Sequence, residues 1–187
     1  MVGTMRKTLL TFGLISGALS SLMMQAALPF ENKIGLDKAE VLGYTIIVLS
    51  FLLVFFGIRS YRDNVGNGQI TFTKAFMVGI AITLISCAFY VVTWEILYFN
   101  FLHGFMDHYG DHTIAKLKAA GASAAAIQAQ IQQLNQYKKM YENPLYNSAI
   151  TFLEPFPVGL VITLMSAAIL RRRGQSQPAQ SPLPASF

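Results

Sequence analysis

Four long runs of apolar residues alternate with polar segments along this chain. They extend over about residues 8–28, 40–58, 72–99 and 145–170. A helix needs about 20 apolar residues to cross the hydrocarbon core of a bilayer, and each run has roughly that length. Apolar side chains continue around every face of these helices, which argues against the amphipathic helices of a soluble protein. The pattern predicts an all-α fold, a polytopic membrane protein with four transmembrane helices.

The first run has a second interpretation as a cleaved signal peptide. Arg6 and Lys7 precede it, as the basic residues of a signal peptide would. However, the run is longer than the usual apolar region of about 7–15 residues, and "MMQAALP" is a poor small-x-small cleavage site. We therefore expect the first run to remain as a span, with cleavage as the alternative.

A polar segment, residues 100–144, separates the third and fourth runs. It is rich in Ala, Lys, Leu and Gln, which favour helices. Gly121 is placed to end one helix in a left-handed cap, and Ser123 to cap the next. We expect an extramembrane helical hairpin over about residues 105–142.

The second helix of this hairpin carries an apolar stripe. Its members recur at helical spacing: Ile127, Ile131, Leu134 and Tyr141. Packing on the partner helix or on the membrane surface is the favoured interpretation, and docking of another protein or a second copy is the alternative.

Residues 1–173 are expected to form a single domain, followed by a tail. The tail, residues 174–187, is rich in Pro, Gln, Ser and Ala and lacks charge. Such a composition cannot bury enough apolar surface to fold, so we expect a disordered end.

Composition agrees with a membrane protein. The chain is 53% hydrophobic and only 12% charged, against roughly 25% charged for soluble domains. Its net charge of +5 does not indicate nucleic-acid binding, because the basic residues lie dispersed at the ends of apolar runs. The single cysteine, Cys87, excludes an intramolecular disulfide.

The distribution of charge predicts the orientation in the membrane. One side carries eight basic residues with Asp63 as its acid: Arg6, Lys7, Arg59, Arg62, Lys74, Arg171, Arg172 and Arg173. The other side mixes lysines with most of the acids. Because basic residues favour the cytoplasmic side, we expect both termini in the cytoplasm.

Several blocks of the sequence resemble a known family. They are "RSYRDNVGNGQITFTKAFMVG", "YVVTWEILYFNF", "FMDHYGDH", "KLKAAGAS", "YKKMYENPLY" and "TFLEPFPVGLVITLMSAAILRRR". Together they resemble domain of unknown function 4199, a family of small bacterial inner-membrane proteins with four spans. The resemblance implies four spans and an outer helical insertion, and it implies no activity. The family pattern is not histidine-rich after "FMD", so His108 and His112 look like features of this chain.

Two carboxylates within the apolar runs are candidates for an intramembrane polar or ion site, because ionisable groups in lipid are costly. Glu95 follows Lys74 by about 31 Å of helix and should lie near the outer interface. Glu154 lies about 15 Å past Pro144, and is therefore deeper. It precedes Pro155, which removes a helix hydrogen bond.

We favour a structural role for these carboxylates. Glu154 would stay protonated and hydrogen-bond to Thr151, Tyr90 or another hydroxyl, and antiparallel packing would place Glu95 on the same interface. A proton or cation site is the first alternative, and a ligand or lipid contact is the second.

Arg59 and Arg62, next to the second run, are candidates for anchoring anionic lipid headgroups, each worth about 1 kcal/mol near an anionic surface. A simple topology anchor is the favoured interpretation, with "DN" and "GNG" forming the turn into the third run.

The segment "HGFMDHYGDH" gathers five residues that are candidates for metal binding or pH sensing: His103, Asp107, His108, Asp111 and His112. On one helix His108 and His112 would share a face, and the other three would share a different one. Two clusters on different faces do not converge on one ion. We favour a solvated hinge where the third span leaves the membrane.

Small residues at four-residue spacing mark packing faces. They are Gly13 and Gly17, continued by Ser20 and Ser21; Ala75, Gly79 and Thr83; and Gly159 and Thr163. We expect packing within the chain, with self-association as the alternative.

The sequence contains no P-loop, GxSxG, HExxH or CxxC motif, so we expect neither an enzyme nor a cofactor. The bilayer is the expected partner, with a membrane protein or a second copy as a further one and no nucleic acid. The favoured function is a structural or accessory protein of the bacterial envelope. A small proton or cation channel or transporter through Glu154 and Glu95 is the first alternative, and metal binding through residues 103–112 is the second.

Overall fold

The computed structural model describes residues 2–34 and 36–172. These residues form helices and contain no strand. In chain order the helices are α1 (Val2–Ile34), α2 (Leu36–Asn64), α3 (Phe72–Asn100), α4 (Phe105–Ala119), α5 (Ala124–Tyr141), α6 (Pro144–Leu153) and α7 (Pro155–Leu170). The tail at 174–187, for which disorder is expected, lies outside the described residues.

Four stretches of helix are long and apolar enough to cross a membrane. They are Met5–Ala26, Val41–Asn64, Phe72–Asn100 and Pro144–Leu170. The prediction of an all-α protein with four helices able to span a membrane is confirmed, and these helices indicate a multi-pass membrane protein.

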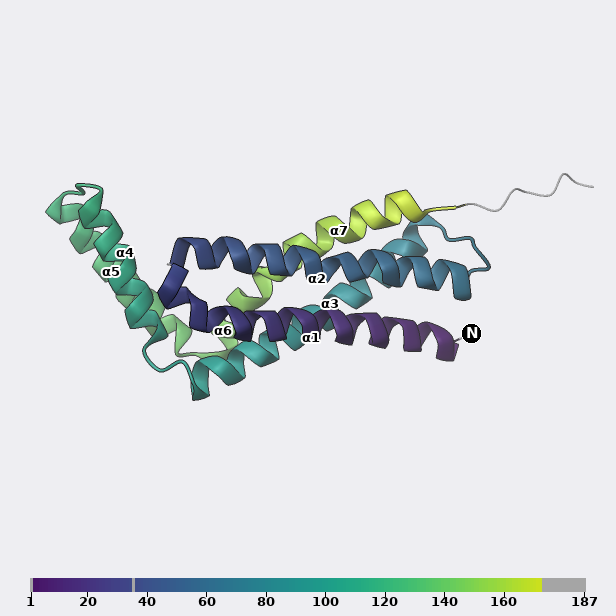
Figure 1. The fold of residues 1–187 in the computed structure, drawn as a ribbon, viewed down its shortest axis with the longest axis horizontal. Coiled ribbons are helices and arrows are strands. Elements are labelled where there is room, and N and C mark those ends of the chain that lie inside the picture. Colours follow the sequence, from purple (N-terminus) through teal and green to yellow (C-terminus); the bar gives the residue numbers. More distant parts are fainter. Residues whose placement is uncertain (1, 35, 173–187) are drawn as a thin grey trace, which may run out of the picture.

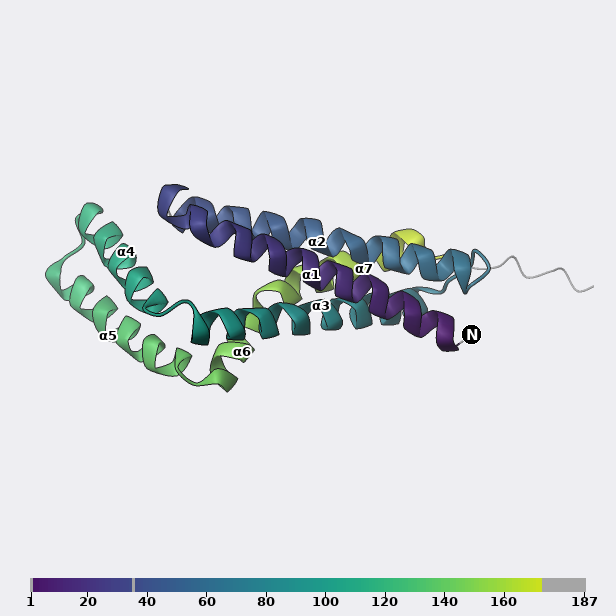
Figure 2. The same ribbon diagram turned by 60° about the horizontal axis from the view of Figure 1, so that its bottom comes forward.

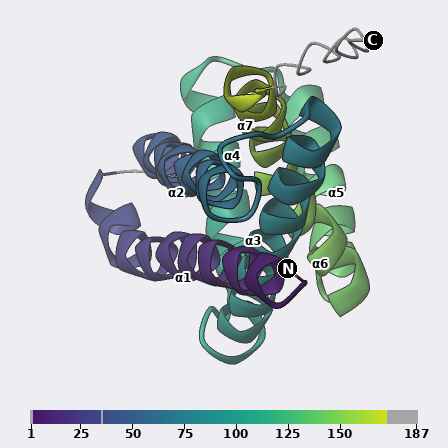
Figure 3. The ribbon, with the colours of Figure 1, turned by 90° about the vertical axis from the view of Figure 1, so that its right-hand side faces the viewer.

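The spans form an elongated bundle in which α3 is central (Figure 1). Helix α1 packs on α2 and α3, and α7 packs on the other side of the same pair, as the end-on view in Figure 3 shows. The bundle is therefore built around the α2–α3 pair, with α1 and α7 on opposite sides.

Buried residues of α2 form the seam of this bundle. They alternate at spacings of four and three: Ile47, Phe51, Val54, Ile58 and Tyr61. This spacing is typical of helices that pack nearly parallel with interdigitating side chains. Between helices in lipid such packing, more than the hydrophobic effect, supplies the stabilisation.

The GxxxG motif of α1 packs against α3. A Cβ atom on Gly13 would lie 2.7 Å from the side chain of Ile85, and one on Gly17 would lie 2.7 Å from Phe89. The Ser86 hydroxyl also donates to the Gly13 carbonyl over 3.1 Å. This face is therefore in use within the chain.

A second close approach joins α3 to α7. A Cβ atom on Gly159 would lie 2.5 Å from Thr83, and one on Gly79 would lie 2.7 Å from Thr163. The hydroxyls of Thr83 and Thr163 are 3.0 Å apart and share a hydrogen bond at full burial. These small residues let the two helices meet closely enough for a hydrogen bond between their side chains.

The fourth span, expected over 145–170, is two helices, with the break at the proline that follows Glu154. Helix α6 ends at Leu153, α7 begins at Pro155, and Glu154 lies at the break. Pro155 has no N–H to donate into the preceding turn, but its fixed φ suits the first position of a new helix. The chain changes direction there, as Figure 1 shows.

Helix α2 continues to Asn64, six residues past the expected end of the span at Ile58. An i, i+4 ion pair between Arg59 and Asp63 adds a small stabilisation to its last turn. The "DN" residues therefore belong to the helix. The turn follows them, with Asn67 and Gly68 at φ of 49° and 80°.

Helices α4 and α5 lie side by side and project from the end of the bundle opposite the N-terminus (Figures 1 and 2). Gly121 between them has φ of 73°, and the Ala122 N–H donates to the Leu117 carbonyl over 3.1 Å. The Ser123 hydroxyl accepts from the Ala126 N–H over 3.2 Å. Both predicted caps are confirmed, and residues 105–141 are called the α4–α5 arm below.

Candidate functional site

A polar junction lies where α3, α5 and α6 meet. Its centre is Asn147, fully buried at 0% exposure. The Trp94 indole N–H donates to Asn147 Oδ1 over 2.9 Å, and the Thr151 hydroxyl donates to the same oxygen over 3.2 Å. Asn147 Nδ2 in turn donates to the Tyr141 carbonyl over 3.3 Å. One amide thus links the end of α5 to two spans.

Glu154 and Tyr90 meet one turn further into the bundle. The Tyr90 hydroxyl donates to Glu154 Oε2 over 3.3 Å. Tyr90 is one of the hydroxyl partners expected for Glu154. The 16 residues of α7 separate Glu154 from Arg171, which is about 24 Å of helix. This contact therefore lies in the half of the bundle nearer the α4–α5 arm.

Glu95 faces the same α3–α6 interface as Glu154. Ser148 of α6 lies beside its carboxylate. One carboxylate oxygen, Oε1, is shielded from solvent and has no hydrogen-bond partner among the described residues. The structure thus places both carboxylates along one interface, with Glu95 nearer the end of the span.

An aromatic cluster surrounds the base of the α4–α5 arm. The rings of Trp94 and Phe105 lie 5.3 Å apart, and those of Tyr98 and Tyr141 lie 6.0 Å apart. Burial, followed by the negative charge of Glu154, raises the pKa of Tyr141 to about 12. Its hydroxyl therefore stays neutral at physiological pH.

Asp107 of α4 pairs with Lys138 of α5 across the arm. The hydrogen bond to Asp107 raises the pKa of Lys138 above its usual range. The contribution of the Asp107–Lys138 pair to stability is therefore present below the usual pKa of lysine. It is lost as the pH rises through the raised pKa of Lys138. Both side chains are largely in solvent, so the pair contributes little energy and mainly sets the register of the two helices.

The structure does not gather the histidine-rich segment into one site. His103 lies in the turn before α4, so it does not share a helix face with Asp107 and Asp111 as expected. The reason is Gly104, whose φ of 82° separates the turn from the helix. Among the described residues no three His, Cys, Asp or Glu side chains lie close enough to hold a metal ion.

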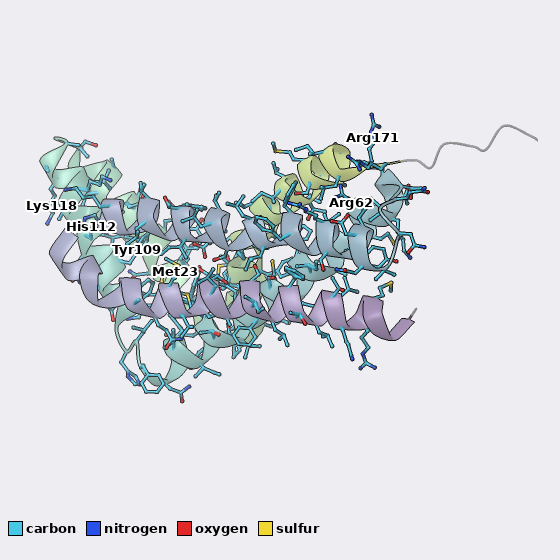
Figure 4. The ribbon with its side chains drawn as sticks, turned by 45° about the vertical axis from the view of Figure 1, so that its right-hand side comes forward. Met23, Arg62, Tyr109, His112, Lys118 and Arg171 are labelled. Carbon is cyan, nitrogen blue, oxygen red and sulfur yellow. The ribbon has the colours of Figure 1, made fainter. Side chains whose placement is uncertain are left out.

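Arginines gather at the other end of the bundle, around Asp63. Arg62 Nε donates to Asp63 Oδ1 over 2.7 Å, and Arg59 Nε lies 3.7 Å from Oδ2. Figure 4 shows Arg62 and Arg171 together at this end, with His112 and Lys118 at the far end on the α4–α5 arm. The molecule thus has a basic end and a mixed-charge end.

A family model described as "Protein of unknown function (DUF4199)" matches residues 11–172. The chain belongs to this family. No curated protein and no solved structure matches it. The resemblance found in the sequence is confirmed, and the match to DUF4199 covers the bundle, the arm and the end of the fourth span.

Sequence reasoning missed Asn147 in this DUF4199 protein. A polar amide inside an apolar run was the available signal, with Thr151 four residues later on the same helix face. Its partner Trp94 lies on a different span, and nothing in the sequence pairs the two.

Proposed function

We propose that this DUF4199 protein is a non-enzymatic accessory protein of the bacterial inner membrane. Its bundle anchors the α4–α5 arm on the outer face, where the arm holds a partner protein. The observation that carries this proposal is the arm itself. Its two helices, of 15 and 18 residues, contain no fully buried residue, so the arm adds little to the core of the bundle.

Contacts with α3 and α6 hold the arm in a fixed position on the bundle. Asn147 ties the end of α5 to α6, and the Asn143 side chain accepts the Leu145 N–H over 3.0 Å as the N-cap of α6. Tyr98 of α3 contacts Tyr141 of α5 through their rings. A segment that is held in place yet unburied is well suited to binding, because little ordering entropy remains to be lost on association.

Charge supports the orientation in this proposal. Arginines cluster at the end that carries α7's last turn, and the arm mixes lysines with acids. By the preference of basic residues for the cytoplasm, both termini lie inside and the arm lies outside. The close packing of Gly13 and Gly17 on α3 supports retention of the first span.

Site-specific photocrosslinking in native membranes tests the accessory role. A photoreactive residue at Gln132, exposed on α5, should give a protein adduct of one defined mass. The same residue at Leu84, 44% exposed on α3, serves as the matched control and should give lipid adducts only. An arm that forms no protein adduct at Gln132 or at neighbouring exposed positions would contradict the proposal.

A second candidate function is conduction of protons or cations along the α3–α6 interface. It is favoured by the shielded Glu95 Oε1, which has no hydrogen-bond partner among the described residues, and by Glu154 at the break between α6 and α7. Carboxylates and interrupted helices within spans are typical of ion pathways.

Flux through proteoliposomes separates this candidate from the accessory role. If the interface conducts, the native protein should dissipate an imposed pH gradient, and Glu154→Gln should abolish that flux. Glu142→Gln, which removes an exposed carboxylate of the hinge after α5, is the matched control and should conduct normally. No flux through the native protein counts against conduction.

A further inference from the structure

The chain after α7 is fastened to the loop before α3 at the basic end of the bundle. The Ile70 N–H donates to the Arg172 carbonyl over 3.0 Å, and the Arg172 N–H donates to the Ile70 carbonyl over 2.9 Å. Ile70 is 4% exposed and belongs to the core cluster. The backbone of Arg172 is therefore held against a packed part of the structure.

This fastening brings Arg172 to the last turn of α2. Arg59 and Arg62 both contact the Asp63 carboxylate, and Arg172 lies near enough to act on the same carboxylate electrostatically. Three arginines from two distant parts of the sequence thus gather at one end of the bundle, and two of them contact Asp63. We call Arg59, Arg62 and Arg172 the arginine clasp; it keeps a net positive charge.

The clasp retains donors for a further anion. The contacts with Asp63 use the Nε atoms of Arg59 and Arg62, and a guanidinium carries four more N–H donors on its two Nη atoms. The Arg59 side chain is 57% exposed, and Arg172 is exposed. Planar groups with paired donors match the oxygens of a phosphate.

The position of the clasp determines which phosphate it meets. The membrane-spanning stretches end at Asn64 and Leu170, next to Arg62 and Arg172. The clasp therefore lies at the level where lipid headgroups lie. Basic residues scattered to fix topology would need no backbone pairing, whereas this pairing fixes where the backbone of Arg172 lies.

We propose that the arginine clasp is a binding site for the phosphate of an anionic lipid headgroup, such as that of phosphatidylglycerol. This site lies at the opposite end from the α4–α5 arm, and the inference does not depend on the proposed accessory role.

Native mass spectrometry of the full chain released from neutral detergent tests the site. Phosphatidylglycerol should be retained in preference to phosphatidylcholine, which carries the same phosphate beside a positive choline. Two arginines contribute about 1 kcal/mol each near an anionic surface, so Arg59→Gln with Arg172→Gln should weaken retention about 30-fold. The substitution at Arg172 leaves its backbone pairing with Ile70 in place.

The matched control is Lys118→Gln, which removes a positive charge at the far end of the molecule and should leave retention unchanged. Inorganic phosphate distinguishes a lipid from a free anion as the ligand. Equal retention of both lipids, an unaffected double variant, or displacement of the lipid by millimolar inorganic phosphate would overturn the proposal.

Discussion

Asn147 shows how one side chain fixes the junction between the bundle and the arm. Its oxygen accepts from Trp94 and Thr151, and its nitrogen donates to the Tyr141 carbonyl. Individual hydrogen bonds between membrane helices contribute only about 0.6 kcal/mol on average. The larger effect comes from leaving buried partners without a hydrogen bond, which costs about 1–3 kcal/mol each.

Replacing Asn147 by leucine should therefore destabilise the protein by about 2–4 kcal/mol, since two donors and one carbonyl lose their partner. Unfolding in mixed micelles with increasing dodecyl sulfate measures the change. The substitution should also increase protease cleavage after α5, because the tie to Tyr141 is lost.

Thr151→Val is the matched control for this prediction. It removes one donor but leaves Asn147 Oδ1 bonded to Trp94, so the loss should stay below about 1 kcal/mol. An Asn147→Leu protein as stable as Thr151→Val would show that the junction is held by packing alone.

At this scale the sequence predicted the carboxylates better than their surroundings. The spacing of Glu95 and Glu154 along antiparallel spans predicted their depths, because the helix rise converts residue number into depth. The rotation of each helix about its axis is not set by residue number. That is why the Trp94–Asn147 bond could not be predicted.

The packing of helices in the bundle depends on the close approach of α3 and α7. Gly159 faces Thr83, which is fully buried and hydrogen-bonded to Thr163. Gly43 of α2 is the opposite case, since an added Cβ would meet nothing within 4 Å. The same substitution at these two glycines should therefore have opposite effects.

Gly159→Ala should destabilise the protein by about 1–2 kcal/mol, because overpacking a buried contact costs more than the better helix propensity of alanine returns. Gly43→Ala should be neutral or stabilise by up to about 1 kcal/mol. Unfolding in dodecyl sulfate measures both, and equal effects at the two positions would contradict close packing between α3 and α7.

Element boundaries were predictable where a local cause sets them. Gly121 and Ser123 cap helices through their own backbone and side chain, so the sequence identified both. Pro155 signalled a disturbed helix but not how α6 would be directed, since that direction depends on its packing against α3. The last six residues of α2 are polar or charged and include the Arg59–Asp63 pair, so a hydropathy pattern does not include them in the helix.

Across the whole molecule, the proposed orientation can be tested by labelling. In a Cys87→Ser background, Gln128→Cys on the arm should react with a membrane-impermeant maleimide added to spheroplasts. Asn64→Cys at the basic end should react only after the membrane is permeabilised. Both positions are exposed, so accessibility rather than burial decides the result.

Reversed labelling of these two cysteines would place the termini outside and overturn the orientation. Labelling of both from one side would mean that the four spans do not all cross the membrane.

The packing of the four spans against one another was the least predictable part of the structure. Four apolar runs predict four spans, but their uniform hydrophobicity hides which face meets which neighbour. The small residues identified the packing faces correctly, yet pairing Gly13 with Ile85 and Gly159 with Thr83 required the structure.

The pairing of Ile70 with Arg172 can form only late in the synthesis of this protein. The ribosome makes Ile70 long before Arg172, so the first three spans enter the membrane before this backbone contact can form. A chain that ended before Arg172 would lack this pairing, and the Ile70 N–H and carbonyl would lose their backbone partner.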